Sequence, residues 1–452
     1  MAFISIIAFA ILTITAFALF FVKAKEIYRN INLGQKENLT DQPDKRLKNM
    51  LLIALGQKKM FRVTVPAILH LFVYVAFLIT QVELIEIFID GFTGHHRILF
   101  HLFQDTLESG VLTGFYTFVV SFIEVISVLA LLATFAFLWR RNLLKVPRLA
   151  MNELNGWPKL DANLILLGEI YLVTCIFMMN GADVAREIST TGSSPYGFIL
   201  SGYFVGPALS GLPLGALNVI ERIGWWGHII GVLGFIVYLP YSKHLHIMLA
   251  FPNTYFMRLK PRGEIYNMPA ITKEIKAMMD PNVDPYAAPA EGTEAAPAKF
   301  GAKDVQDLSW KNLLDAYSCT ECGRCTAACP ANQTGKLLSP RKIIMDTRDR
   351  LEEVGKNIKA HGPDFIDNKQ LLGDYISVEE LRACTTCQAC VQECPVSIDP
   401  LDIIVQLRRA LIMEDSNSPE EWNLMFSNIE NNAAPWQFSQ QDRDKWANEL
   451  VK

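Results

Sequence analysis

The chain has 452 residues, of which 51% are apolar and 19% charged, and its formal net charge is −4. This length predicts two or more folding units, and the near-neutral charge gives no indication of a nucleic-acid partner. Long apolar stretches gather in residues 1–250, which argues against a single soluble domain.

Five apolar segments are long enough to cross a bilayer at about 1.5 Å per helical residue. They are residues 3–22, 64–89, 111–139, 161–180 and 223–250. The first has no basic start and is followed by lysines, so we interpret it as a span and not as a cleaved signal. Buried helices of a large soluble protein are the competing interpretation.

Basic residues alternate between the intervening loops. Residues 23–62 and 140–160 carry ten and five Lys or Arg, whereas residues 90–110 and 181–220 carry only Arg97 and Arg186. The positive-inside rule then predicts an outer N-terminus, five spans and a C-terminal half in the cytoplasm. We therefore expect a multi-pass protein of a bacterial or archaeal cytoplasmic membrane, in contact with lipid.

Histidines in the apolar half are candidate haem ligands. If residues 223–250 form one helix, His228 and His246 lie five turns apart on one face, and His244 points to nearly the opposite face. Depth in the membrane pairs His70 with His246, and two imidazoles from different helices can hold the iron of a b-type haem. His228 would lie near a second, outer haem, for which His96 is the best remaining partner.

Each of these histidines has a simpler interpretation as a hydrogen-bonded packing residue. For His244, together with Lys243, contact with a haem propionate, with a quinone or only with water stays open. Glu83, Glu124 and Glu169 lie in or near spans and are candidates for carrying protons to a quinone or for bonding a ligand imidazole. Pairing with neighbouring serine, tyrosine or asparagine explains these acids equally well, and Cys175 is expected to be a packing residue.

Residues 256–305 are predicted to form a linker, because 281–303 is rich in alanine and proline and poor in large apolar residues. The linker separates a membrane domain, residues 1–255, from a soluble domain, residues 306–413. The polar tail, residues 414–452, carries three tryptophans and is a candidate docking segment.

Two cysteine motifs of the form C-x2-C-x2-C-x3-C-P dominate the soluble half. The first contains Cys319, Cys322, Cys325 and Cys329, and the second contains Cys384, Cys387, Cys390 and Cys394. In this pattern three thiolates bind one [4Fe–4S] cluster and the fourth reaches the other cluster. We therefore expect one cluster on Cys319, Cys322, Cys325 and Cys394, and the other on Cys384, Cys387, Cys390 and Cys329.

Zinc and disulfides are less suitable explanations for these eight cysteines. Zinc sites have four ligands, usually in two separated pairs, and disulfides are rare in the cytoplasm. The long interval between the motifs favours an α-helical ferredoxin domain. Helices are expected at 339–355, where Ser339 and Pro340 form a typical start, and at 398–413.

The membrane half resembles the five-helix cytochrome b subunits typified by the gamma subunit of respiratory nitrate reductase. It resembles still more the membrane subunits of heterodisulfide-reductase-type complexes, and the soluble half is similar to the small iron–sulfur subunit of heterodisulfide reductase. The resemblance implies an all-α fold. It also implies haem ligands on the second and fifth spans, at His70, His228 and His246.

Such relatives move electrons between a quinone and a cytoplasmic redox partner. The chain has no further cysteine repeats and no G-x-G-x-x-G fingerprint, so substrate chemistry is expected on another subunit, either cysteine-rich or a flavoprotein. A membrane anchor without haem, carrying a ferredoxin domain for a partner enzyme, is the alternative. An ion-pumping redox module that uses the three span acids is a third hypothesis.

Overall fold

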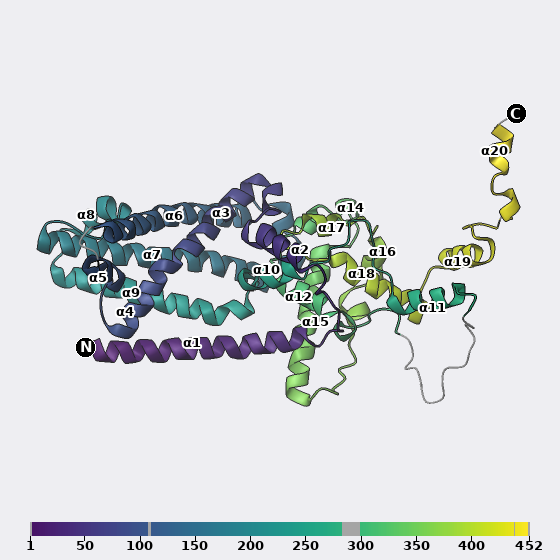
Figure 1. Ribbon diagram of the computed structural model, residues 1–452, viewed down its shortest axis with the longest axis horizontal. Coiled ribbons are helices and arrows are strands. Elements are labelled where there is room, and N and C mark those ends of the chain that lie inside the picture. The colour runs from purple at the N-terminus through teal and green to yellow at the C-terminus, as the bar shows by residue number, and fades with distance from the viewer. Residues whose placement is uncertain (1, 107–109, 283–298, 438, 451–452) are drawn as a thin grey trace.

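The computed structural model describes residues 2–106, 110–282, 299–437 and 439–450. These residues are mostly helical, and their only β pairing is in isolated bridges. Figure 1 shows an elongated molecule with a bundle of long helices at one end and shorter helices packed at the other. The all-α fold expected from the sequence is confirmed.

Five helical segments are long and apolar enough to cross a membrane. They are α1 (Ala2–Ile31), α3 with α4 (Thr64–Ile79 and Gln81–Thr93), α6 (Val111–Asn142), α7 (Trp157–Thr191) and α9 (Leu214–Tyr238). All five correspond to the predicted spans, although α7 is much longer than residues 161–180. Many of their large apolar side chains, such as Phe118 and Ile230, are exposed on the outer surface of the bundle.

The fifth span differs from its prediction, because it begins nine residues earlier and does not continue to residue 250. Helix α9 ends at Tyr238, two short turns follow at Leu239–Tyr241 and Lys243–Leu245, and α10 begins at His246 (His246–Tyr255). Pro240 lies in the first turn, and Ser242 is extended with φ −113° and ψ 151°. The single-helix phase that placed His228 and His246 on one face is therefore wrong.

Short helices close the far end of the bundle, where α5 (Ile98–Thr106) and α8 (Gly206–Leu209) lie. Arg97 is buried there, with its side chain 2% exposed and 3.2 Å from Glu83 and 3.5 Å from Asp183. The topology argument treated Arg97 only as a loop charge. The structure places it inside a network that joins α4 to α7.

The shorter helices form a second packed unit around one apolar core. They are α12 (Trp310–Ser318), α13 (Arg324–Ala327), α14 (Pro330–Gln333), α15 (Pro340–His361), α16 (Val378–Ala383), α17 (Ala389–Glu393) and α18 (Pro400–Arg409). Leu313, Ile343 and Ile404 are fully buried in this core. Ser339 accepts a hydrogen bond from the Lys342 N–H at the start of α15, as its sequence predicts.

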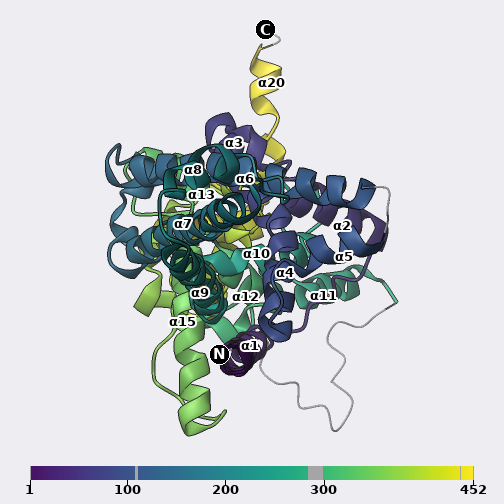
Figure 2. The ribbon, with the colours of Figure 1, turned by 90° about the vertical axis from the view of Figure 1, so that its left-hand side faces the viewer.

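The two units are joined by side chains as well as by the chain itself. Helix α1 runs along the edge of the bundle and reaches the second unit (Figures 1 and 2). Its Asn30 is fully buried and donates to the Tyr317 hydroxyl at 3.0 Å, and Lys23 forms a 3.0 Å ion pair with Glu352. The ends of α1, α6, α7 and α9 nearest the second unit adjoin the lysine- and arginine-rich loops.

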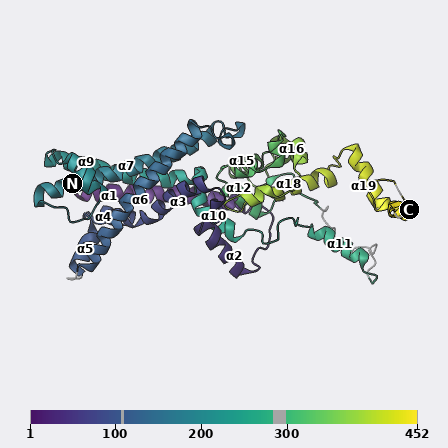
Figure 3. The same cartoon turned by 90° about the horizontal axis from the view of Figure 1, so that it is seen from above.

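Residues on either side of the packed core form the remaining helices. These are α2 (Pro43–Met50), α11 (Pro269–Met279), α19 (Glu420–Asn432) and α20 (Lys445–Leu450). Most of the predicted Ala- and Pro-rich stretch, residues 283–298, lies outside the described residues. Figure 3 shows α19 leading away from the body of the molecule. The tail tryptophans Trp436 and Trp446 are more than half exposed.

Candidate functional site

The eight motif cysteines line two cavities. One cavity is lined by Cys319, Cys322, Cys325 and Cys394. The other is lined by Cys329, Cys384, Cys387 and Cys390. Each cavity thus receives three cysteines of one motif and the last cysteine of the other, which is the grouping that crossed ligation requires. We call these sets the inner and the outer cysteine group.

The two motif loops have the same backbone conformation. Glu321 and Thr386, two residues after the first cysteine of each motif, have φ values of 55° and 56°, and Gly323 and Gln388 have 71° and 60°. These left-handed residues turn main-chain N–H groups toward sulfur, so that the N–H of Glu321 lies 3.4 Å from Cys319 Sγ. Such loops stabilise anions, which suits thiolates bound to an iron–sulfur cluster.

Residues of the membrane half hold the inner group in place from one side. Arg148 donates to the Cys322 carbonyl, and Arg324 Nη1 donates to the Met60 carbonyl at 3.1 Å. Lys243 pairs with Glu321, the residue before Cys322. Burial raises the pKa of Glu321, but Lys243 and Arg348 more than offset this and hold it below its usual value. The first motif is therefore fastened to three loops at this end of the bundle.

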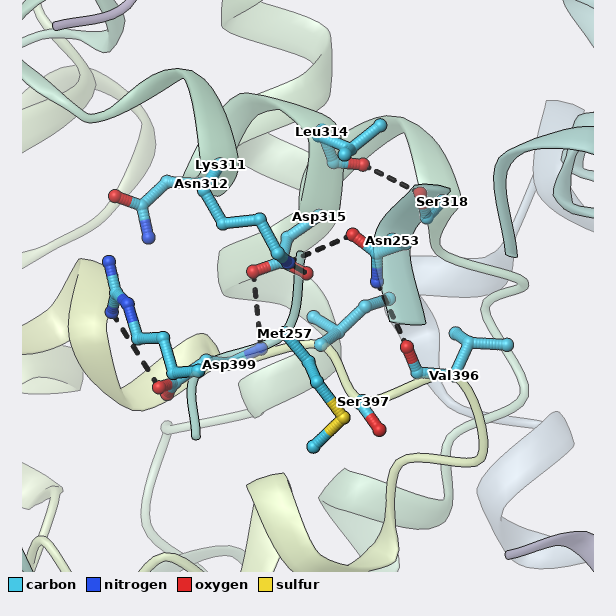
Figure 4. A network of polar contacts seen from close by, with 12 residues as sticks. Asn253, Met257, Lys311, Asn312, Leu314, Asp315, Ser318, Val396, Ser397 and Asp399 are labelled. Atoms are coloured by element: carbon cyan, nitrogen blue, oxygen red, sulfur yellow. Dashed lines mark hydrogen bonds and ion pairs between the residues drawn. The ribbon is translucent and has the colours of Figure 1, made fainter. Parts of the chain in front are cut away.

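A buried polar network supports the inner group from the other side, behind Cys394 (Figure 4). Asn253 of α10 donates to the Val396 carbonyl at 2.9 Å and accepts from Lys311 Nζ at 2.9 Å. Lys311 also pairs with Asp315 at 2.6 Å, and both side chains are at most 2% exposed. The network joins the end of the bundle to the loop that carries the fourth cysteine of the group.

His70 and His246 are brought together by the fold. Their ring centres lie 6.5 Å apart, and two imidazoles on opposite sides of one metal would have centres roughly 6 Å apart if the metal–nitrogen bonds are about 2 Å. His70 Nδ1 lies 3.1 Å from Gln57 Oε1, and His246 Nδ1 lies 3.1 Å from the Lys243 carbonyl. Each ring therefore keeps Nε2 for another partner. Ligand histidines usually bond a carbonyl through the other nitrogen in this way.

The histidines differ in their remaining surroundings. The rings of His244 and His246 have centres 5.4 Å apart, and His244 also packs against Phe235. His228 Nδ1 lies 3.2 Å from the Leu172 carbonyl. Protein atoms surround all four rings, yet each remains partly accessible, as expected of side chains that line an internal space. These surroundings fit a planar cofactor.

His96 is engaged at the far end of the bundle. Its Nε2 lies 2.9 Å from Asp183 Oδ2 and 3.4 Å from Arg186, and its ring packs on Tyr196. None of these contacts, within the described residues, is to His228. The structure therefore places His96 in the Arg97 network and leaves the partner proposed for His228 in a different set of contacts.

The three span acids have unequal roles in packing. Glu83 pairs with Arg97 and accepts from Asn180 at 3.2 Å. Glu124 accepts from the N–H groups of Leu200 and Ser201. Glu169 is half-buried and forms no hydrogen bond within the described part of the chain. Pairing with neighbours therefore accounts for two of the acids and leaves Glu169 as the available one.

Residues 318–398 match the family model of the 4Fe-4S dicluster domain. The chain is an iron–sulfur protein. It is 28% identical over 98% of its length to a "Probable iron-sulfur-binding oxidoreductase FadF" of Bacillus subtilis and covers 60% of that protein. It is 26% identical over 94% of its length to an "EtfAB:quinone oxidoreductase" of Syntrophomonas wolfei, of which it covers 55%. The chain thus spans little more than half the length of these relatives.

The dicluster domain has relatives among shorter proteins as well. One component of a CoB-CoM heterodisulfide reductase from Methanosarcina acetivorans is 38% identical over 24% of this chain, which covers 53% of that component. No solved structure matches the chain. The matches confirm the expected likeness to heterodisulfide-reductase-type iron–sulfur proteins and the presence of 4Fe-4S clusters.

Sequence reasoning missed the residues that fasten the dicluster domain to the bundle. Lys59, Arg148 and Lys243 entered only as loop charges or as a neighbour of His244, and Gln57 and Asn253 had no assigned role. Their positions beside the bundle end, in loops that also contain prolines, were the only available signal. Their partners are main-chain carbonyls of the cysteine loops, which no residue pattern reveals.

Proposed function

We propose that this chain is a membrane-embedded electron-transfer subunit that connects a redox partner protein with quinone through two 4Fe-4S clusters and haem b. One observation carries the proposal: the inner cysteine group is fastened to the same segments that position His70 and His246. Lys243 contacts Glu321 through its side chain and His246 through its carbonyl. The quinone-linked relative from Syntrophomonas supports the assignment of quinone.

The inner and outer cysteine groups are the proposed ligand sets of the two clusters. The thiolates supply the iron ligands, and the clusters, when bound, supply one-electron carriers. The chain's own contribution is placement. The loop N–H groups of Glu321 and Thr386 face Cys319 and Cys384 Sγ at 3.4 Å each, and such hydrogen bonds help to set the reduction potential.

His70 and His246 are the proposed axial ligands of a haem, which when bound supplies another one-electron carrier. Gln57 and the Lys243 carbonyl fix the orientation of the two rings through Nδ1. His228 is available for a second haem, for which His96 has no contact of the required kind within the described residues. His244 lies beside His246 and is a candidate for contact with a haem propionate or a quinone.

The proposed topology places the dicluster domain in the cytoplasm of a bacterium or archaeon, with the N-terminus outside. The loops rich in lysine and arginine all lie at the dicluster end of the bundle, as the positive-inside rule requires. Proton transfer to a quinone needs an acid that is not otherwise engaged. Glu169 is the span acid that meets this condition within the described residues.

The function is tested with the full chain purified without oxygen in mild detergent. Reduction with dithionite should give a b-type Soret and alpha band together with cluster EPR signals. Addition of a short-chain menaquinone should then reoxidise both. Cluster signals without a haem band would overturn the haem assignment and leave the alternative, a membrane anchor that carries a ferredoxin domain for a partner enzyme.

The ion-pumping hypothesis receives less support. Glu83 and Glu124 are already bonded to Arg97 and to main-chain N–H groups, so neither is free to take up and release a proton cheaply. Reconstituted vesicles decide the matter. We expect quinone turnover without proton or cation movement beyond that of the quinone chemistry.

A further inference from the structure

The geometry points to a fixed order of the two clusters: the inner group relays electrons to the membrane half, and the outer group exchanges them with a soluble one-electron redox protein. This inference rests on the proposed function and deepens it. Each electron that the partner delivers would reduce the outer cluster by one unit and then pass to the inner cluster, which leaves the outer cluster oxidised again. Two such transfers would accompany the two-electron reduction of a quinone.

The inner group is enclosed between the two halves of the molecule. Three of its contacts with the membrane half lie around Cys322 and Cys325: Arg148 to the Cys322 carbonyl, Lys243 to Glu321, and Arg324 to the Met60 carbonyl. Two more lie around Cys394. Asn253 donates to the Val396 carbonyl, and Lys59 Nζ lies 3.2 Å from Ser397 Oγ. A soluble partner has no access to this cluster from the bundle side.

The same contacts connect the inner group to the paired imidazoles by very few residues. Gln57 holds His70, and Arg324 bonds the carbonyls of the residues that follow Gln57 in the same loop. On the other side, Lys243 contacts both Glu321 and His246. The first motif therefore touches the supporting segment of each histidine.

The outer group faces away from the bundle. Cys387 is the only motif cysteine that is exposed, and it lines the outer cavity next to Thr385 and Gln388. The chief support of this loop comes from within the dicluster domain, where Arg408 Nε donates to the Leu381 carbonyl at 2.9 Å. The segment after α10 reaches the loop through the Gly263 N–H, which donates to Gln388 Oε1. The Cys387 edge is thus open to a partner.

Spin relaxation tests this order without any need for haem or quinone. The full chain in detergent is reduced with dithionite, and the power saturation of each cluster signal is measured with and without a neutral, water-soluble gadolinium chelate. We expect the chelate to relax one cluster strongly and the other weakly. Cys387→Ser should alter the strongly relaxed signal, and Cys322→Ser the protected one. The reverse assignment, or equal relaxation of both signals, would overturn the order.

A second measurement uses the ammonium group of Lys59, which lies beside the inner group. Removal of a nearby positive charge disfavours the extra electron, so Lys59→Met should lower the midpoint potential of the protected cluster and leave the exposed one unchanged. Lys58→Met is the matched control, because Lys58 is the exposed neighbour, and it should shift neither potential. A shift confined to the exposed cluster, or none, contradicts the inference. A missing haem band in the same sample would instead count against the proposed function.

Discussion

The ring centres of His70 and His246 lie 6.5 Å apart, although His70 belongs to α3 and His246 begins α10. Each ring keeps Nδ1 on an oxygen of a neighbouring residue, which leaves both Nε2 atoms for a ligand between them. The pair stands where the bundle meets the dicluster domain. It is the place at which a carrier in the membrane half comes nearest to the inner cysteine group.

Substitution of either histidine should remove the haem that we propose. We expect His70→Ala and His246→Ala to lose the reduced alpha band of that haem while the cluster EPR signals persist, because the cysteine groups are held by other residues. His95→Ala, at an exposed outer position, is the control and should keep the band. Retention of the band in both variants would exclude this pair as ligands.

Gln57→Leu tests the support of the ligand pair. It removes the oxygen that accepts from His70 Nδ1, and loss of such a partner typically costs about 10- to 100-fold in affinity for the bound group. We expect the variant to fold and to lose haem to a competing apo-haem protein faster by a factor in this range. An unchanged rate of transfer would show that the Gln57 bond does not support a ligand.

Cys329→Ser tests the crossed ligation. Cys329 follows the first motif in sequence but lines the cavity of the second. We therefore expect loss or conversion of the outer cluster in EPR and Mössbauer spectra and an intact inner cluster. Cys175→Ser should change neither spectrum, since Cys175 is buried between α7 and α9, far in sequence from both motifs. Damage confined to the inner cluster would contradict the crossed assignment.

Spacing was a sufficient guide to the cysteine groups because the ligands of each cluster lie on one tight loop. The positions Cys319, Cys322 and Cys325 can face one cavity only if the loop turns sharply, and the left-handed Glu321 and Gly323 provide that turn. Local chemistry and local backbone conformation agree there. The same holds for the helix start at Ser339.

The sequence was a poor guide to the end of the fifth span. A continuous helix was assumed through Pro240, whereas the chain leaves the helix at Tyr238 and extends at Ser242. Residues 239–250 are apolar because they pack against the dicluster domain as well as the bundle; Leu245, for example, belongs to the core that includes Leu313. Hydropathy does not distinguish burial in lipid from burial against protein.

Loop charges carried two meanings that the sequence could not separate. Lys59, Arg148 and Lys243 count toward the positive-inside rule, and they also donate to the cysteine loops. Arg97 was assigned to an outer loop, yet it is buried among acids of α4 and α7. Partners that are remote in sequence decide such roles.

Lys311→Met should strongly destabilise the dicluster domain. It leaves the Asp315 carboxylate buried without its cation, and breaking such a pair typically costs about 3–5 kcal/mol. The rate of cluster loss on heating, followed by absorbance, should rise accordingly. Lys260→Met is the control, because Lys260 and Glu264 form an exposed pair that contributes about 1 kcal/mol or less. Equal rates in the two variants would show that the network of Figure 4 is not important for stability.

Arg97→Gln should destabilise the other end of the bundle by a similar mechanism. The Arg97 side chain lies 3.2 Å from Glu83 and 3.5 Å from Asp183 and is almost completely buried, so its removal leaves both acids without their central cation. We expect a cost of about 3–5 kcal/mol, seen as a lower midpoint of thermal unfolding by circular dichroism in detergent. Arg222→Gln is the matched control, since Arg222 is half exposed and pairs with its sequence neighbour Glu221. If both variants unfold at the wild-type temperature, the buried network does not hold α4 and α7 together, and packing of their apolar side chains must do so instead.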